Sequence, residues 1–187
     1  IYTFTMPSSN VTVSVSFAAS TGLPFTDVTS SDWYYAAVKY VYDNHLMQGV
    51  GDTSFAPTAK LTRGMIAQVL YNMEGKPAVS VSAAFNDVAA GVWYTDAVNW
   101  AASKQIVSGY GDGKFGPADN ITREQMAVIL YNYATYKGYD TTQGGMAVRE
   151  FSDAEKISTW AESAMNWAVH SKLLSGKGTG LLDPTGT

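Results

Sequence analysis

The feature that most constrains this chain of 187 residues is that it repeats itself. The tetrad Phe25-Thr26-Asp27-Val28 returns as Phe85-Asn86-Asp87-Val88, and a third copy begins at Phe151. A unit that recurs after roughly sixty residues is too small to bury its own apolar face, so it must stack on its neighbours. The sequence therefore predicts three similar units and not one irregular domain.

Each unit begins with the pattern of an amphipathic helix. A tryptophan (Trp33, Trp93 or Trp160) is followed by apolar residues at i, i+3 and i+4 spacing, such as Ala97, Trp100 and Ala101. We expect the tryptophans to anchor the core, with contact to a ligand as the alternative. The glycines that follow are predicted helix stops; they are Gly49, Gly109 and Gly176.

A second helix is predicted after a loop of the form Gly-x-Gly-Asp…Phe-x-Pro, at 49–57 and 109–117. Thr122 is a natural N-cap, because its hydroxyl can accept from a backbone N–H that has no partner inside the helix. Gln125 completes a capping box with it. The first copy keeps Thr62 but has Gly64 and Met65 next, which removes the box and weakens the helix start by up to about 1 kcal/mol.

An arginine follows the capping threonine in both copies, as Arg63 and Arg123. The first turn of a helix already carries partial positive charge, so a cation there is unfavourable unless an anion lies in front of it. An arginine fork backed by free N–H groups suits a carboxylate. The repeated Thr-Arg pair therefore predicts an anion site at each helix start; the alternative is a surface arginine paired with a nearby carboxylate.

Composition excludes several functions. The net charge is −4 with 12 Lys and Arg and no basic run, which argues against binding of nucleic acid or another polyanion. Cysteine is absent and only two histidines are present, so we expect no metal site and no cofactor. No apolar run approaches the roughly twenty residues of a membrane helix, so membrane insertion is not expected.

The ordered pattern Phe-x-Asp-Val…Trp-Tyr…Gly-Asp…Phe-x-Pro…Thr-Arg resembles the S-layer homology domain of bacterial envelope proteins, from Phe25 to the C-terminus. The resemblance implies a mainly α fold, in which three helix-loop-helix repeats form a pseudo-trimeric, three-pronged bundle. We place the repeats at 21–80, 81–145 and 146–187, the third lacking its second helix. Residues 1–20 are predicted to be a short β segment and linker, the end of an upstream module of a Gram-positive surface protein.

The resemblance implies an extracellular location, at the cell wall or S-layer. It also implies a non-catalytic function, the binding of secondary cell-wall polysaccharide that is associated with peptidoglycan. The acidic, often pyruvylated, sugar would bind in grooves between prongs. Aromatic rings would pack on sugar faces, and loop glycines would let the backbone approach the ligand. The candidate glycan-binding residues are Arg123, Arg63, Thr122, Thr62, Asp87, Asp27, Asp153, Trp93, Trp33, Trp160, Gly111, Gly51, Asp112 and Tyr110.

Other interpretations remain open. The three aspartates can cap the following turn instead of shaping a groove, and Gly111-Asp112-Gly113 predicts a turn and not a calcium loop. A helical-repeat scaffold for protein partners is the main alternative function. A fragment of a wall glycoside hydrolase would need paired carboxylates, for which Glu124, Glu150, Glu155 and Glu162 are available. An incomplete third repeat would also leave Trp160, Trp167 and Leu174 uncovered, which predicts self-association there.

Overall fold

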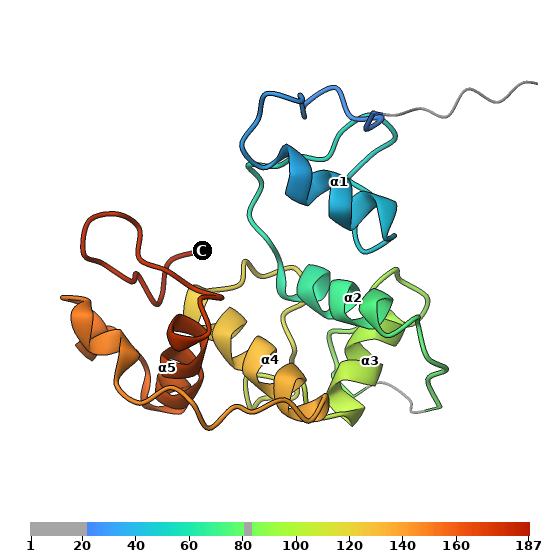
Figure 1. The fold of residues 1–187 in the computed structure, drawn as a ribbon. Coiled ribbons are helices and arrows are strands. Elements are labelled where there is room, and N and C mark those ends of the chain that lie inside the picture. The colour runs from blue at the N-terminus through green and yellow to red at the C-terminus, as the bar shows by residue number, and fades with distance from the viewer. Residues whose placement is uncertain (1–21, 81–83) are drawn as a thin grey trace, which may run out of the picture.

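The computed structural model describes residues 22–80 and 84–187, and this part of the chain is helical (Figure 1). It contains no β-strand, and the predicted N-terminal β segment lies outside the described residues. The first two repeats contribute two α-helices each, and the third contributes one, preceded by three short 3₁₀ turns. The helices are α1 (Tyr35–Asp43), α2 (Arg63–Met73), α3 (Thr95–Ser103), α4 (Arg123–Tyr136) and α5 (Glu162–His170); the turns are Ala147–Glu150, Ala154–Lys156 and Thr159–Ala161.

The second helix of each repeat packs on the first helix of the next repeat. Helix α2 pairs with α3, and α4 pairs with α5. One core cluster accordingly joins Leu70 of α2 to Trp100 of α3, and another joins Ala127 of α4 to Met165 of α5. Asn72 and Asn132 tie the second helices back to their own repeats by donating to the carbonyls of Leu46 and Ile106. Each second helix thus bridges two repeats.

Helix α1 lacks a partner of this kind among the described residues, and its core cluster is small. The buried members of that cluster are Phe25, Val28 and Val38. In contrast, Trp167 of α5 is 6% exposed because α4 covers it. The prediction that the third repeat has an uncovered apolar face is therefore wrong for Trp167. The repeat with the open helix is the first, because each second helix covers the following repeat and not its own.

The first helix of each repeat ends before the glycine that the sequence predicts as its stop. Each closes at a residue with a positive φ that is not glycine, namely His45 (58°), Gln105 (58°) and Lys172 (59°). The later glycines serve packing instead. A Cβ on Gly109 would lie 2.8 Å from the ring of Phe85, and a Cβ on Gly176 would lie 2.6 Å from Phe151. The phenylalanine of each tetrad thus needs a bare backbone to pack on.

A polar contact joins α2 to α4 away from their helix starts. The Tyr133 hydroxyl donates to Glu74 Oε1 at 2.6 Å, and Lys137 Nζ donates to the same oxygen at 2.9 Å. Burial of the ring and the contact with Glu74 raise the pKa of Tyr133, so the hydroxyl stays a donor at neutral pH. This contact fixes the two bridging helices relative to each other.

Candidate functional site: the junctions between repeats

The helix starts lie against the loop of the following repeat. The backbone N–H groups of Arg63 and Gly64 donate to the carbonyls of Asp119 (3.0 Å) and Pro117 (2.9 Å). We call this contact between the α2 start and the loop 109–120 the first junction. In the second junction, between the α4 start and the loop 175–187, the N–H groups of residues 123 and 124 donate in the same way to Gly186 and Pro184. These first-turn groups therefore have protein partners, and the predicted free N–H groups behind an external anion are wrong.

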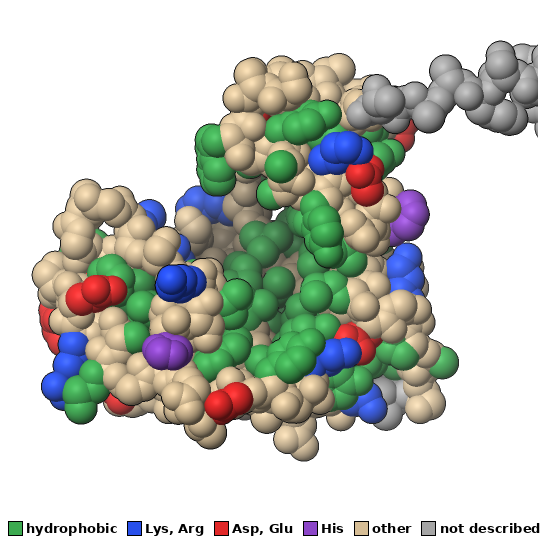
Figure 2. Space-filling view, in the orientation of Figure 1, with side chains coloured by type: hydrophobic (Ala, Val, Ile, Leu, Met, Phe, Trp, Pro, Cys, Tyr) green, Lys and Arg blue, Asp and Glu red, His purple; other side chains and the backbone are tan. Residues whose placement is uncertain are grey.

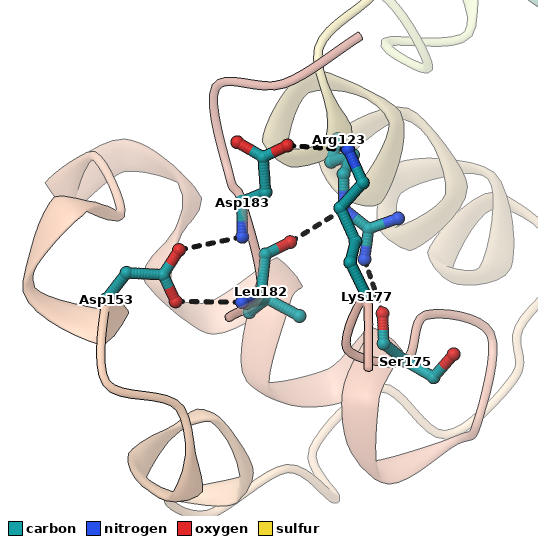
Figure 3. A network of polar contacts seen from close by, with 6 residues as sticks. All are labelled: Arg123, Asp153, Ser175, Lys177, Leu182 and Asp183. Carbon is teal, nitrogen blue, oxygen red and sulfur yellow. Dashed lines mark hydrogen bonds and ion pairs between the residues drawn. The ribbon is translucent and has the colours of Figure 1, made fainter. Parts of the chain in front are cut away.

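The arginine side chains strengthen the same contacts. Arg63 Nε donates to the Phe115 carbonyl at 2.7 Å, and its Nη2 donates to the Ser108 carbonyl at 2.8 Å. Arg123 repeats the pattern on the carbonyls of Leu182 and Ser175 (Figure 3). A guanidinium is suited to this because its donors form a rigid planar fork. Each arginine thus ties the beginning of the neighbouring loop to its middle.

Arg63 is almost fully enclosed, at 5% exposure, between the rings of Tyr110 and Phe115. Its guanidinium carbon lies 4.7 Å and 4.6 Å from the two ring centroids. Burial lowers its pKa, whereas Tyr110, Asp119 and Asp87 act in the opposite direction. Arg63 and Arg123 form no ion pair within the described ranges, so the alternative of a surface arginine paired with a carboxylate is not what the structure contains.

The aspartates of the tetrads organise the loops. Asp87 accepts from the backbone N–H groups of Phe115 and Gly116, both at 2.8 Å, and Asp153 accepts from Leu182 and Asp183 at the same distance (Figure 3). Asp27 holds the first loop in the same way. Its bonds to the Phe55 and Ala56 N–H groups and to the Ser54 hydroxyl lower its pKa to about 2. These carboxylates hold the loop and do not cap the turn that follows them, so the capping interpretation is wrong.

The three tryptophans point to solvent, and the prediction that they anchor the core is wrong. Trp33 is 92% exposed, Trp93 59% and Trp160 57%. Trp93 packs edge-on against Tyr94, whose ring lies beside Gly64 in the first junction. Trp160 follows Ser158, which contacts the start of α4 in the second junction. An exposed indole thus lies near the first junction, Trp160 stands two residues from a contact of the second, and Trp33 is their counterpart by register in the first repeat.

The glycine loops also carry the remaining candidates. Tyr110 is 50% exposed, covers Arg63 with its ring and donates its hydroxyl to Asp119 at 3.0 Å. Asp112 accepts from the N–H of Lys114 at 3.0 Å, which is the turn that the sequence predicts. Gly51 and Gly111 have open space where a side chain would lie.

The sequence did not predict the contacts made by the second residue of α2 and of α4, which are Gly64 and Glu124. Glu124 is 5% exposed, and its carboxylate accepts from both the N–H and the hydroxyl of Ser158 at 3.0 Å. Glycine stands at the same two places in the first junction, as Gly64 and Gly91. A Cβ on Gly64 would lie 2.9 Å from the Pro117 carbonyl oxygen, so the bare backbone is required there. Gly64 thus makes a close contact that helix propensity alone does not predict; the replacement of both Glu124 and Ser158 by glycine was the signal available in the sequence.

The helix caps agree with the sequence. Thr122 and Gln125 form both halves of the capping box. Thr62 accepts from the N–H of Met65 at 3.3 Å, and Met65 has no side-chain group with which to complete the box. The predicted difference between the two helix starts at this position is confirmed.

Comparison with known proteins identifies the repeats. The S-layer homology domain matches at residues 24–64, 84–127 and 150–187. The chain belongs to the S-layer homology family. Each match begins at the phenylalanine tetrad, and the first two end just inside the second helix. Three repeats of this family, as the sequence predicts, are therefore confirmed.

The related proteins are much longer than this chain. An endoglucanase of Bacillus sp. (strain KSM-635) is 31% identical over 88% of the chain, which spans 17% of that enzyme. The S-layer protein sap of Bacillus anthracis is 29% identical over 93% of the chain and 21% of its own length. A cell surface protein of Thermoanaerobacter kivui is 31% identical over 72% of the chain. The shared part is thus the repeat region, a kind of module that serves in anchoring at the cell surface.

No helix in residues 22–80 and 84–187 is long and apolar enough to cross a membrane.

Proposed function

We propose that this chain is a non-catalytic module that anchors the protein to which it belongs by binding secondary cell-wall polysaccharide at the junctions between repeats. The observation that carries the proposal is the exposed tryptophan beside each junction. Three large indole rings at the same register of three repeats face water, where burying them would gain free energy. A sugar ring offers an apolar face that such a ring can cover.

The charge of the junctions supports an acidic sugar. Arg63 and Arg123 donate only to neutral carbonyls, so their positive charge has no ion-pair partner within the described ranges. A partly buried cation without a counterion is costly, and a carboxylate from outside would offset that cost. A ketal-linked pyruvate carries such a carboxylate. We infer that pyruvylated polysaccharide is the preferred ligand.

The second junction is the more accessible of the two to such a ligand. Arg123 is partly exposed, whereas Arg63 lies beneath Tyr110. We therefore expect Arg123→Ala to weaken binding of the polysaccharide more than Arg63→Ala does. The stability of both variants has to be measured alongside, because both side chains also hold a loop.

The test is a binding titration with purified wall polysaccharide, with and without its pyruvate groups. Trp93→Ala and Trp160→Ala should each weaken binding about tenfold, which corresponds to about 1.4 kcal/mol. Tyr139→Ala is the matched control, because this ring is 63% exposed but makes no contact with a junction. Equal binding to both polymers would refute the acidic-sugar part, and unchanged binding by both tryptophan variants would refute the site.

A competition experiment distinguishes glycan binding from the alternative of a scaffold for protein partners. Soluble wall polysaccharide should release the chain from immobilised wall polymer if the chain binds glycan, and it should have no effect on a contact between two proteins. The alternative of a glycoside hydrolase is weakened, because both carboxylate oxygens of Glu124, one of its candidate catalytic groups, accept hydrogen bonds from Ser158. An assay of reducing-sugar release from the same polymer should give no turnover.

A further inference from the structure

The loops of the two junctions differ in the side chain that stands two residues after the first carbonyl bound by the arginine. Tyr110 follows Ser108 in the second repeat, and Lys177 follows Ser175 in the third. Both residues have the same backbone contact, because the N–H of each donates to the carbonyl four residues later, at 2.9 and 3.0 Å. The same place in the loop thus presents an aromatic ring at one junction and an ammonium group at the other.

A second loop position, six residues further on, differs together with the first. It is Gly116 beside Tyr110 and Asp183 beside Lys177. A Cβ on Gly116 would lie 2.6 Å from the ring of Tyr110, so the ring needs a glycine there. Asp183 instead pairs with the ammonium group of Lys177 at 2.7 Å (Figure 3). Each loop therefore carries a matched pair of side chains.

The ring of Tyr110 separates Arg63 from a ligand that approaches the first junction. The ring centroid lies 4.7 Å from the guanidinium carbon, while the tyrosine as a whole is 50% exposed. Its hydroxyl donates to the exposed carboxylate of Asp119. Burial and this hydrogen bond raise the pKa of Tyr110, so the hydroxyl stays a donor at neutral pH. A ligand thus meets a flat ring and a carboxylate, which suit the apolar face and the hydroxyl groups of a neutral sugar.

The second junction presents positive charge instead. Arg123 is partly exposed, and the side chains of Lys177 and Asp183 are 52% and 39% exposed. Two cations and one carboxylate leave one positive charge unbalanced among these three groups. Local contacts have to select an acid, because Lys and Arg are interspersed with Asp and Glu over the face shown in Figure 2 and the net charge is −4. An exposed ion pair is weak, so the carboxylate of an acidic sugar can compete with Asp183 for Lys177.

We propose that this loop position determines the sugar that each junction binds, with Tyr110 selecting a neutral sugar at the first junction and Lys177 an acidic sugar at the second. The inference rests on the proposed function and makes it more specific. The carboxylate of the polysaccharide is then recognised at the second junction alone, and Arg63 is a structural residue of the first.

The test uses two small probes, a methyl hexoside with a ketal-linked pyruvate and the same hexoside without it. Each is titrated into the 187-residue chain while the indole N–H signals are followed by heteronuclear NMR. Trp93 packs on Tyr94 beside the first junction, and Trp160 stands two residues from a contact of the second. The Trp160 signal should report about tenfold tighter binding of the acidic probe. The Trp93 signal should report affinities for the two probes within about twofold of each other.

A double variant, Lys177→Tyr with Asp183→Gly, gives the second loop the pair of the first without changing the net charge. Glycine suits position 183, where φ is 54°. The preference for the acidic probe at Trp160 should fall from about tenfold to within about twofold. Lys177→Met, which keeps the loop backbone and Asp183, should reduce the preference as well. Lys156→Met is the matched control, because it removes the same charge from an exposed site of the same repeat and should keep the preference.

Two results would overturn this proposal and leave the proposed function standing. One is a preference for the acidic probe that survives in both Lys177 variants. The other is a preference of the same size at Trp93 and Trp160 in the unaltered chain. If neither probe moved either indole signal, the glycan site itself would be refuted together with its specificity.

Discussion

The first and second junctions have the same backbone contacts but different side chains around them. Arg63 is enclosed by Tyr110 and Phe115, whereas Arg123 is partly exposed beside a loop closed by the Lys177–Asp183 ion pair at 2.7 Å (Figure 3). The second junction adds the Glu124–Ser158 contact and a full capping box. The first has a glycine fitted against Pro117 instead. A helix start can therefore be held by aromatic enclosure or by polar contacts, and the arginine is common to both.

The strongest test of this comparison replaces the arginines. Arg63→Ala should lower the free energy of unfolding by about 3 kcal/mol, because it leaves the buried Phe115 carbonyl and the partly buried Ser108 carbonyl without donors. Arg123→Ala should cost about 1 to 2 kcal/mol, since water can reach its carbonyls. Urea unfolding measures both values. Arg149→Ala, at an exposed arginine, should change the value by less than about 0.5 kcal/mol. A larger loss for Arg123→Ala would show that enclosure is not what strengthens the first junction.

A second test concerns the glycine of the first junction. Helix propensity alone predicts that Gly64→Ala stabilises the chain by about 1 kcal/mol. The contact with the Pro117 carbonyl predicts the opposite sign, a loss of about 1 kcal/mol, because a Cβ would lie 2.9 Å from that oxygen. Gly51→Ala, where the added atom meets open space, is the control and should be close to neutral. Thermal unfolding gives the sign directly.

A third test addresses the loops that all repeats share. The pKa of Asp27 is about 2 in the folded chain, below its ordinary value of 3.8, because loop N–H groups and the Ser54 hydroxyl stabilise the carboxylate. A lowered folded-state pKa means that the stabilisation is present above about pH 4 and is lost as the pH falls toward 2. Asp27→Asn should flatten the dependence of the unfolding midpoint on pH in this window. An unchanged slope would show that the carboxylate does not hold the loop.

The smallest expected effect comes from the caps. Gln125→Ala removes one half of the capping box of α4 and should cost about 0.5 to 1 kcal/mol. Met65→Gln should give α2 the missing half and a gain of similar size. The two variants together would make the helix starts alike at this position. Differential scanning calorimetry can resolve both changes; a loss on Met65→Gln would indicate that Met65 contributes more by packing than a cap does.

The sequence was sufficient to predict the repeats, their register, the helical class and the N-caps, because these depend on short-range patterns. It did not predict which helices pair. The apolar stripe of α2 shows that the helix needs a partner but does not say that the partner is α3 of the next repeat. The wrong prediction for Trp167 has the same cause. It assumed that a second helix of the same repeat would be needed to cover this ring, whereas α4 of the preceding repeat covers it.

The candidate residues show a second limit. Trp33 and Trp100 are equally apolar, yet one is 92% exposed and the other 2% exposed. Trp33 lies two residues before α1 begins, whereas Trp100 lies inside α3, and only the packed structure shows which of these two positions is covered. Arg63 and Arg123 were singled out correctly as unusual first-turn cations. Their partners, carbonyl oxygens 45 to 59 residues away, could not be read from a local pattern.

Because α2 pairs with the next repeat, it is synthesised before the partner that covers it. Arg63 donates to a carbonyl 52 residues later, so α2 leaves the ribosome well before its acceptor loop exists. At 5–20 residues per second, this delay is roughly 3 to 10 s. During that time the apolar side of α2 is a surface that a chaperone or a neighbouring nascent chain can bind. The second helices of the first and second repeats are therefore covered only after the following repeat has been synthesised.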